Sequence, residues 1–402
     1  MSSRPRHTVR NGLPLLALLL VSGTAFRSGD GPAPEASLAA ELSRELQSLL
    51  ERAVSEDSTL PGVLLHVDAP RLGLSFDGAA GVADRATGEP LTPRHPLRIA
   101  SNTKTFVAAA ILRLHEDGKL ELDAPIAAHV SPEHALLLVG DGYDPAAIKV
   151  RHLLTHTSGL FDYGDSAQFG ERIEADPGHR WTRTEQLAGA MEWGDPYGAP
   201  GEVYRYADTG YILLGEIVER ASGQPLADAL RGLLDFDRLG LASTWLETLE
   251  PPPAGSQDRA HQYLGESDTH DWDPSFDLYG GGGLAATAGD LARFMRGLFG
   301  GRVYRRAETL ETMLTSVAAA RGGPAYGGEE QRPGVYRMGI SVREIDGLEV
   351  YQHSGFWGTT AAYVPSLDVA IGLAVTQQES PARGALLRQA LEVVRAASAG
   401  GS

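Results

Sequence analysis

The sequence contains no cysteine, which excludes disulfides, thiolate zinc sites and a lipid anchor on a cysteine. Lysine is also scarce: three residues of 402 are lysine, and most of the 35 basic side chains are arginine. The net charge of −17 argues against nucleic acid or anionic lipid headgroups as partners. We therefore expect a small-molecule or peptide substrate and no nucleic-acid partner.

Long hydrophobic runs are missing as well. The N-terminal run Leu13–Val21 has nine residues, fewer than the roughly 20 needed to span a bilayer. Arg4, Arg6 and Arg10 precede it and small residues follow, a pattern typical of a secretory signal peptide, here residues 1–25. An uncleaved membrane anchor is the alternative interpretation. We expect a periplasmic or secreted protein with no stable membrane insertion after signal cleavage.

The remaining chain is predicted to form one domain, residues 36–398, after a disordered lead-in, residues 26–35, rich in Gly, Pro and Ser. Residues 36–54 show helical periodicity. Two segments that favour strands follow, residues 62–67 and 72–82. The N-terminal part of the domain is thus predicted to be a helix followed by two strands.

The middle of the chain, about residues 101–245, is mainly helical in pattern. A helix is expected at residues 287–297 and another at 381–397. Four strands are predicted between them, at residues 336–342, 348–353, 359–364 and 369–376. The fold class predicted is α/β of the α+β type: an antiparallel sheet flanked by helices from both chain ends, with an inserted all-helical subdomain.

One of the three lysines lies in Ser101-Asn102-Thr103-Lys104. At a spacing of three on a helix, the hydroxyl of Ser101 and the amine of Lys104 project from the same side. A serine at a helix N-terminus with an amine within reach is an activated nucleophile. The motif alone is weak evidence, since an ordinary helix N-cap followed by a surface lysine has the same sequence pattern.

Further segments occur in a fixed order after this one. They are Leu153-Leu-Thr-His-Thr-Ser-Gly-Leu160, Tyr206-Ala-Asp-Thr-Gly-Tyr-Ile-Leu-Leu-Gly215, Gly281-Gly-Gly-Leu-Ala-Ala-Thr287 and His353-Ser-Gly355. Together with Arg98–Lys104 the set resembles the serine β-lactamase and D-alanyl-D-alanine carboxypeptidase superfamily, in particular the branch related to class C β-lactamases. The resemblance covers about residues 45–395 and implies the β-lactamase/transpeptidase-like fold.

The resemblance also implies roles. Ser101 would be the nucleophile, and Lys104 and Tyr206 would share proton transfer, with either one as the base. The backbone N–H groups of Ser101 and Phe356 would form the oxyanion hole. His353 would line the cleft as a catalytic-site residue. Substrate contacts would come from Asp208, Ser354 and Gly355, and neither a cofactor nor a metal is implied.

Two positions depart from the β-lactamase pattern. Asp208 stands where Asn is usual, and His353 stands where Lys usually faces a substrate carboxylate. Because His is mostly neutral near pH 7, the site loses a cation. A lost charge-assisted hydrogen bond is worth about 1.5–3 kcal/mol, which disfavours carboxylate-bearing substrates. Arg383 or Arg343 is a candidate for supplying the missing cation.

Other signals are weaker. His152 and His156 lie four residues apart, but without the Glu of an H-E-x-x-H motif a structural role is favoured over a metal site. His270 lies in an Asp-rich segment that indicates a polar surface loop. Tyr279–Gly283 is expected to be a tight backbone passage near the cleft, because no basic residue completes a phosphate loop. No G-x-S-x-G motif is present, so the α/β-hydrolase fold lacks its central signal.

The function predicted is that of an exported serine hydrolase that forms an acyl-enzyme on Ser101 and acts on small esters, amides or D-amino-acid peptides. A D-alanyl-D-alanine carboxypeptidase or weak β-lactamase is the alternative within the same class. A non-catalytic penicillin-binding or cell-wall-binding module is the alternative of another class.

Overall fold

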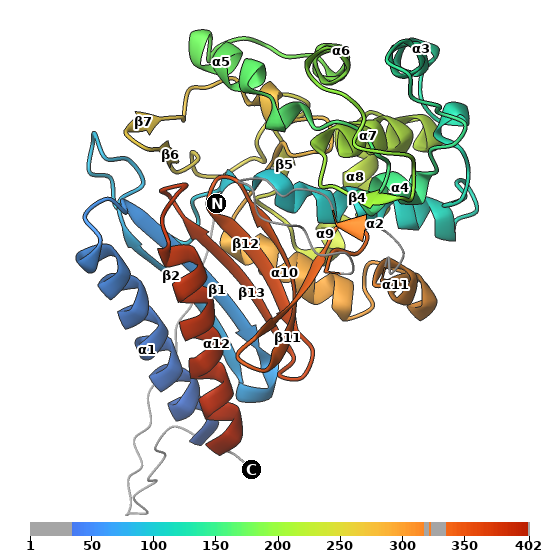
Figure 1. Cartoon of the computed structure of the whole chain (residues 1–402). Helices are drawn as coiled ribbons and strands as arrows, with labels where there is room; N and C mark the ends of the chain where they lie inside the picture. Colours follow the sequence, from blue (N-terminus) through green and yellow to red (C-terminus); the bar gives the residue numbers. More distant parts are fainter. Residues whose placement is uncertain (1–33, 317–320, 323–334, 401–402) are drawn as a thin grey trace, which may run out of the picture.

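The computed structural model describes residues 34–316, 321–322 and 335–400. The predicted signal peptide, and residues 26–33 of the predicted lead-in, lie outside the described residues. A six-stranded antiparallel sheet joins the two ends of the chain in the order β10-β11-β12-β13-β1-β2 (Figure 1). Its strands are β1 (Gly62–Ala69), β2 (Leu74–Gly81), β10 (Ser341–Ile345), β11 (Leu348–Gly355), β12 (Thr359–Val364) and β13 (Val369–Val375).

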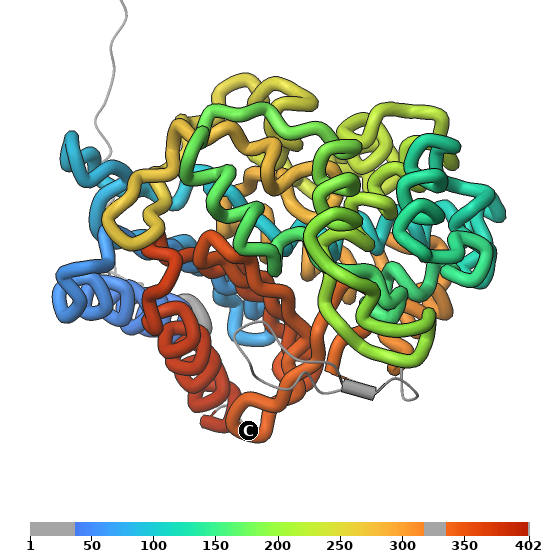
Figure 2. Tube along the Cα trace, turned by 45° about the horizontal axis from the view of Figure 1, so that its top comes forward, coloured from blue at the N-terminus to red at the C-terminus, as the bar shows by residue number. Residues whose placement is uncertain are grey.

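Two terminal helices, α1 (Pro34–Glu56) and α12 (Ala382–Gly400), cover one face of the sheet and lie side by side (Figure 2). Leu46 and Leu50 of α1 are fully buried in the core between these helices and the sheet. The helix begins at Pro34, so the predicted lead-in is two residues too long. Proline suits the first turn of a helix, where its missing N–H is not needed.

The opposite face of the sheet is covered by α10 (Ala288–Phe299). Thr287 caps this helix by accepting a hydrogen bond from the backbone N–H of Asp290, as its sequence predicts. Beyond α10 lies a block of helices inserted between the two halves of the sheet (Figure 1). They are α2 (Thr103–Glu116), α3 (Pro132–Gly140), α4 (Val150–Leu154), α5 (Ala167–Ala175), α6 (Arg183–Trp193), α7 (Asp208–Ser222), α8 (Leu226–Leu234), α9 (Phe236–Leu239) and α11 (Ala307–Met313).

Short strands occur in and around the inserted block, which was predicted to be all-helical. Strand β4 (Val203–Tyr204) pairs in parallel with β9 (Arg321–Gly322). A second small sheet has the order β3-β8-β5, and its strands are β3 (Leu97–Arg98), β5 (Trp245–Leu246) and β8 (Leu284–Ala286). A hairpin of β6 (Tyr263–Leu264) and β7 (Ser267–Asp268) completes the set. Strands of two or three residues are too short for their alternation to be read from sequence.

One predicted strand is displaced. Residues 336–342 were expected to be extended, but β10 begins at Ser341. Gly339 has a φ of 76° and its carbonyl accepts a hydrogen bond from Thr105 of α2 at 2.6 Å. The segment before β10 is therefore bound to α2 and also folds back on β10, where the Val342 N–H donates to the Val335 carbonyl at 2.8 Å. The other three predicted C-terminal strands are confirmed with small shifts at their ends.

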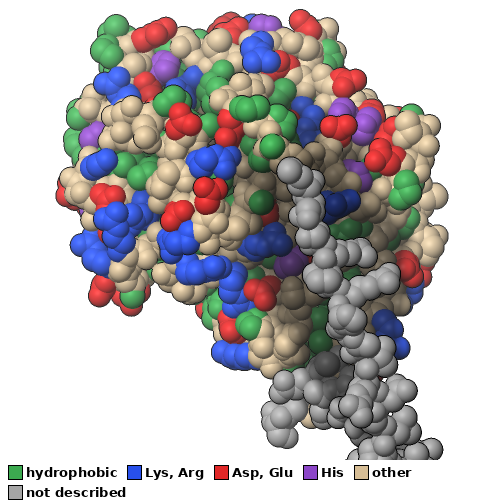
Figure 3. Space-filling model, turned by 180° about the vertical axis from the view of Figure 1, so that it is seen from behind, with side chains coloured by type: hydrophobic (Ala, Val, Ile, Leu, Met, Phe, Trp, Pro, Cys, Tyr) green, Lys and Arg blue, Asp and Glu red, His purple; other side chains and the backbone are tan. Residues whose placement is uncertain are grey.

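The surface carries charges of both signs. On the face seen in Figure 3, basic and acidic side chains are interspersed with hydrophobic ones. Within the part of the chain that the structure describes, no helix has the length and apolar content needed to cross a bilayer.

Candidate active site

Ser101 lies at a sharp change of direction between β3 and α2, in a 3₁₀ turn of Ala100–Asn102. The residue before it, Ala100, is buried and has a φ of 45°. A non-glycine residue in this region costs about 1–3 kcal/mol and persists only where the surroundings enforce it. Strain of this kind concentrates at functional sites, and here it sits directly before the serine.

Neighbouring groups hold this turn in place. The side chain of Asn102 donates to the Thr359 hydroxyl at 2.8 Å and accepts from the Ala361 N–H at 3.1 Å, which ties the turn to β12. Gly355 at the end of β11 packs so closely that a Cβ there would lie 2.2 Å from the Ile99 carbonyl oxygen. The serine is thus fixed against the edge of the main sheet.

Lys104 points from the first turn of α2 back to the serine, as the spacing predicts. Its Nζ donates to Ser101 Oγ at 2.8 Å and to the Gly281 carbonyl at 2.5 Å. It also lies 2.5 Å from Asp208 Oδ1, and none of the Lys104 side chain is exposed. A fully buried ammonium requires a counter-charge, and Asp208 supplies it.

The glycine run Gly280–Gly283 supplies the backbone carbonyl, that of Gly281, to which Lys104 donates. Gly280 and Gly283 have φ values of 120° and 102°, which only glycine adopts readily. At Gly282 a Cβ would come within 2.0 Å of Asp277 Oδ1. The run is a tight backbone passage beside the nucleophile, with the Asp277 carboxylate against Gly282 and Lys104 Nζ bonded to the Gly281 carbonyl.

Tyr206 completes the group around the nucleophile with a side-chain hydrogen bond to Ser101. Burial, and next the charge of Asp208, raise the pKa of Tyr206 well above its ordinary value, so its hydroxyl is a neutral phenol near pH 7. The His156 ring lies 4.1 Å from the Tyr206 ring and its Nδ1 accepts from the Ala207 N–H. His156 therefore positions the tyrosine segment, in line with the structural role predicted for it.

His353 is oriented away from the substrate space. Its Nδ1–H donates to the Ser354 carbonyl at 2.9 Å, so its Nε2 accepts from the Tyr336 hydroxyl at 3.0 Å. Burial, and next the Lys104 charge, lower the pKa of His353 to about 3, which leaves the ring neutral. Arg383 donates to the Gly355 carbonyl at 2.9 Å.

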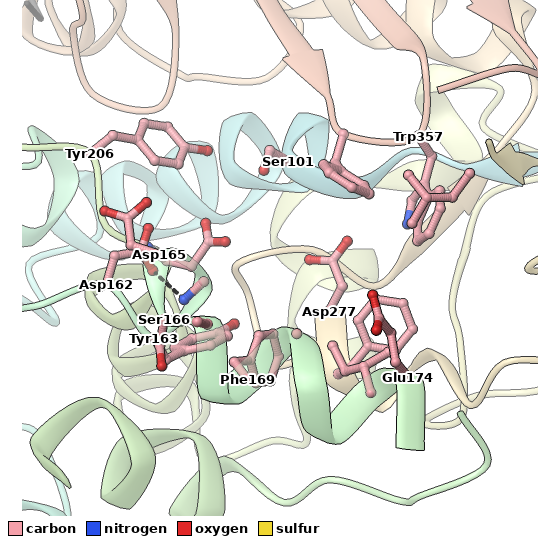
Figure 4. A pocket seen from close by; sticks show the side chains of 18 of the residues that line it. Ser101, Asp162, Tyr163, Asp165, Ser166, Phe169, Glu174, Tyr206, Asp277 and Trp357 are labelled. Carbon is pink, nitrogen blue, oxygen red and sulfur yellow. Dashed lines mark hydrogen bonds between the residues drawn. The ribbon is translucent and has the colours of Figure 1, made fainter. Parts of the chain in front are cut away.

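The serine opens into a cavity of about 570 Å³ (Figure 4). Of the predicted site residues, Ser101, Tyr206, Asp208 and Phe356 line it, and Lys104 lies behind the serine. His353, Ser354, Gly355, Arg343 and Arg383 are not among its lining residues, although the first three belong to the strand next to the nucleophile turn. The structure thus gathers the nucleophile, both candidate bases and Phe356 at one opening.

Aromatic and acidic side chains make up much of the cavity wall. The acidic ones are Asp162, Asp165, Glu174, Asp208 and Asp277, and the basic one is Arg205. Rings of Phe169, Phe276, Phe356 and Trp357 also line it. Asp208, adjacent in space to Lys104, was the only acidic residue among these that the sequence singled out.

Two of these carboxyl groups have strongly shifted proton affinities. Burial, and next the Asp208 charge, raise the pKa of Asp162 well above its usual range and that of Asp277 to about 7. Asp162 Oδ1 accepts from the N–H groups of Gly164 at 3.1 Å and Asp208 at 3.0 Å. Asp165 is paired with Arg205 and accepts from Tyr197 at 3.0 Å.

A separate group away from the cavity has donors suited to a metal ion. Ligand atoms of Asp84, His261 and Asp268 lie within 4.8 Å of one another. Neither His152 nor His156, the pair weighed in the sequence, belongs to it. Asp268 is the one member that comes from the Asp-rich loop expected around His270.

Sequence reasoning missed Asp162, Asp277 and Trp357. Asp162 follows the Leu153–Leu160 segment by two residues, and Asp277 precedes the glycine run by three. Their proximity to conspicuous segments was the available signal. Nothing local distinguishes them from surface aspartates, because they meet at the cavity only through the tertiary fold.

Comparisons with known proteins agree with this geometry. The Beta-lactamase family matches residues 50–395 of the chain. Esterase EstB of Burkholderia gladioli is 29% identical over 371 residues, which cover 84% of this chain and 90% of the esterase. Penicillin-binding protein 4 of Amycolatopsis lactamdurans is 31% identical over 245 residues, which cover 58% of this chain and 59% of that protein.

A similar solved structure is the D-amino acid amidase of Ochrobactrum anthropi SV3 in complex with L-phenylalanine amide. It has 25% sequence identity and a TM-score of 0.72, and the match covers 89% of this chain and 99% of the amidase. The β-lactamase/transpeptidase-like fold expected from the motifs is thereby confirmed.

Proposed function

Because the chain belongs to the beta-lactamase family and is a serine hydrolase, we propose that it forms an acyl-enzyme on Ser101. Its substrates are small esters, amides or D-amino-acid peptides, classes that the esterase and amidase relatives suggest. The observation that carries the proposal is the contact of Ser101 Oγ with Lys104 Nζ, at 2.8 Å, at the opening of the cavity. The alternative of a non-catalytic binding module is set aside, because the chain belongs to a family of serine hydrolases.

Acylation begins when Ser101 Oγ attacks the acyl carbon and its proton passes to the Lys104 amine. Lys104 must first lose an ammonium proton, and Asp208 Oδ1 at 2.5 Å is the acceptor within reach. With His353 neutral, no second cation repels the Lys104 ammonium, so an internal acceptor takes over the task of freeing the amine.

The leaving group departs with a proton from Tyr206. Its raised pKa keeps the phenol protonated until the C–O or C–N bond breaks, and the phenolate that forms regains a proton from Lys104. The N–H groups of Ser101 and Phe356 are assigned to bind the developing oxyanion, and both residues line the cavity. Water then repeats the steps in reverse order on the acyl-enzyme and restores Ser101.

Export is a further part of the proposal. It rests on the basic and apolar N-terminal segment and on the lack of cysteine, which frees folding from any disulfide requirement. A periplasmic or secreted hydrolase fits a net charge of −17.

A fluorophosphonate probe tests the nucleophile. Incubation followed by peptide mass spectrometry is expected to give one adduct, on Ser101, and turnover of p-nitrophenyl acetate should fall by about 10⁴-fold or more in Ser101→Ala. Ser158→Ala is the matched control and should still be labelled. Absence of an adduct on Ser101, in protein that circular dichroism shows to be folded, would overturn the proposal.

A further inference from the structure

The charges that line the cavity do not balance. Two of its carboxylates have cationic partners: Asp165 is paired with Arg205, and Asp208 with Lys104. Among the described residues, Asp162, Glu174 and Asp277 form no ion pair. Glu174 is exposed at the rim, where water solvates it. The carboxyl groups inside the cavity that have no cationic partner are therefore those of Asp162 and Asp277.

Asp277 is the less satisfied of the two. Asp162 accepts two backbone hydrogen bonds, whereas the Asp277 carboxylate has no hydrogen-bond partner among the described residues. It is held at the end of a 3₁₀ turn of Pro274–Asp277, directly against Gly282. In Figure 4 it points up into the cavity between Ser101 and Phe169. A partly buried carboxylate that faces the substrate cavity without a cationic partner is complementary to a positively charged ligand group.

An independent observation comes from the same end of the cavity. Trp357 is 1% exposed and lines the cavity, yet its Nε1–H has no hydrogen-bond partner among the described residues. Buried indole N–H groups usually find an acceptor. An unmet donor beside an unmet anion points to a ligand with both a positive charge and a hydrogen-bond acceptor close together.

The walls around these groups suit an organic cation. Phe169, Phe276 and Phe356 line the cavity with Trp357, and Phe356 is 43% exposed at its mouth. Aromatic faces attract ammonium groups, most strongly when the ion is desolvated. The same rings accept the hydrocarbon part of such a substrate.

We propose that this cavity selects ester and amide substrates that carry an ammonium group near the scissile carbonyl, with Asp277 as the counter-charge. The inference rests on the proposed function, since Ser101 would attack the carbonyl while the ammonium binds Asp277. The acyl–oxygen or acyl–nitrogen bond breaks as in the steps above. Amino-acid esters and amides with a free amino group belong to this class, and they have the acceptor that Trp357 lacks.

Proton affinity supports the geometry. The groups that act on Asp277 are Asp208, Lys104, Arg98 and Glu247, after the effect of burial. Their balance leaves the carboxyl protonated well below pH 7 and ionised above it. Selectivity for a cation is therefore expected to increase from pH 6 to pH 8.

A matched pair of substrates tests the proposal. The p-nitrophenyl ester of 4-(trimethylammonio)butyrate keeps its charge at every pH, and the ester of 5,5-dimethylhexanoate has nearly the same shape without it. We expect kcat/KM to favour the cationic ester by at least about tenfold at pH 8, as one desolvated charge contact allows. Asp277→Asn should reduce this ratio by at least about fivefold, since an amide carries no charge.

Asp228→Asn, which removes an exposed carboxylate on α8, is the control and should keep the wild-type ratio. Equal kcat/KM for the two esters, or an unchanged ratio in Asp277→Asn, would overturn the inference while leaving the proposed function intact. Failure of the wild type to cleave either ester or to accept a fluorophosphonate on Ser101 would instead overturn the proposed function.

Discussion

At the Ser101 end of the cavity the buried cation has a counter-ion, whereas the other end carries a carboxylate without one. Lys104 is fully buried and its Nζ contacts Ser101, Gly281 and Asp208. Among the described residues, Asp277 forms no ion pair and Trp357 Nε1 has no hydrogen-bond partner. The paired end is organised before a substrate binds, and the unpaired end is complementary to the ammonium group of the substrate proposed above.

The difference bears on how each end is stabilised. Buried pairs cost desolvation but recover it through contact, and removing one member is strongly destabilising, by about 3–5 kcal/mol. An unpaired carboxylate recovers nothing in the free protein. Stability given up at such a position is typical of binding sites, where function opposes folding.

The largest effect expected from altering the paired end is that of Tyr206→Phe. We expect kcat/KM for an amide or alkyl ester to fall by about 10²–10⁴-fold, because the leaving group loses its proton donor. A p-nitrophenyl ester should lose much less, since p-nitrophenolate departs without a proton. Hydrolysis of both substrates should be followed side by side in the variant and the wild type.

Tyr204→Phe is the matched control for this experiment, because Tyr204 is buried nearby but does not line the cavity. Equal losses for the two leaving groups in Tyr206→Phe would show that the tyrosine is the base for Ser101, and would reverse the assignment made above.

Much of the paired end was predictable from sequence. The three-residue spacing of Ser101 and Lys104 lies within one helical turn, so local geometry determines their contact. The Tyr206 segment was found through a family resemblance, and the sheet through strand alternation and its flanking helices. What was missed locally is the φ of 45° at Ala100, because alanine gives no signal of a left-handed conformation.

The unpaired end was not predictable for a different reason. Asp277 and Trp357 are 80 residues apart in the numbering of the chain, and neither has a periodic or motif-based signal. Their candidate role in binding follows from their place in the cavity and from the partners that they lack, and only a tertiary structure reveals both. His353 was expected at the cleft because of its motif. The structure instead gives both of its nitrogens partners away from the cavity, a consequence of Tyr336 packing against it.

A smaller effect is expected at the pair of Lys104 and Asp208. In Asp208→Asn the ammonium loses its internal proton acceptor, so Lys104 must release its proton to solvent. The wild type should show a nearly flat kcat/KM for a neutral ester between pH 6 and 9. The variant should be about tenfold slower across this pH range, because Lys104 loses the carboxylate that contacts its Nζ beside Ser101.

Rescue sharpens this test. Adding His353→Lys to Asp208→Asn places a second cation near Lys104, which opposes its protonation and should restore part of the rate at pH 7. An unchanged rate in Asp208→Asn would contradict a proton-accepting role for Asp208.

The smallest effect concerns stability at the unpaired end. The pKa of Asp277 is about 7 in the folded protein against an ordinary value of 3.8, so the folded state binds its proton more tightly. Stability is therefore lost as the pH rises from about 4 through 7, and the full cost is present above 7. Asparagine has no charge to desolvate, so Asp277→Asn should be more stable than the wild type at pH 8, by about 1–2 kcal/mol, and similar near pH 4. Urea unfolding at the two pH values measures this difference, with Asp228→Asn as the variant that should show none. A loss of stability in Asp277→Asn at pH 8 would mean that the carboxylate already has a structural partner, and the contrast between the two ends of the cavity would disappear.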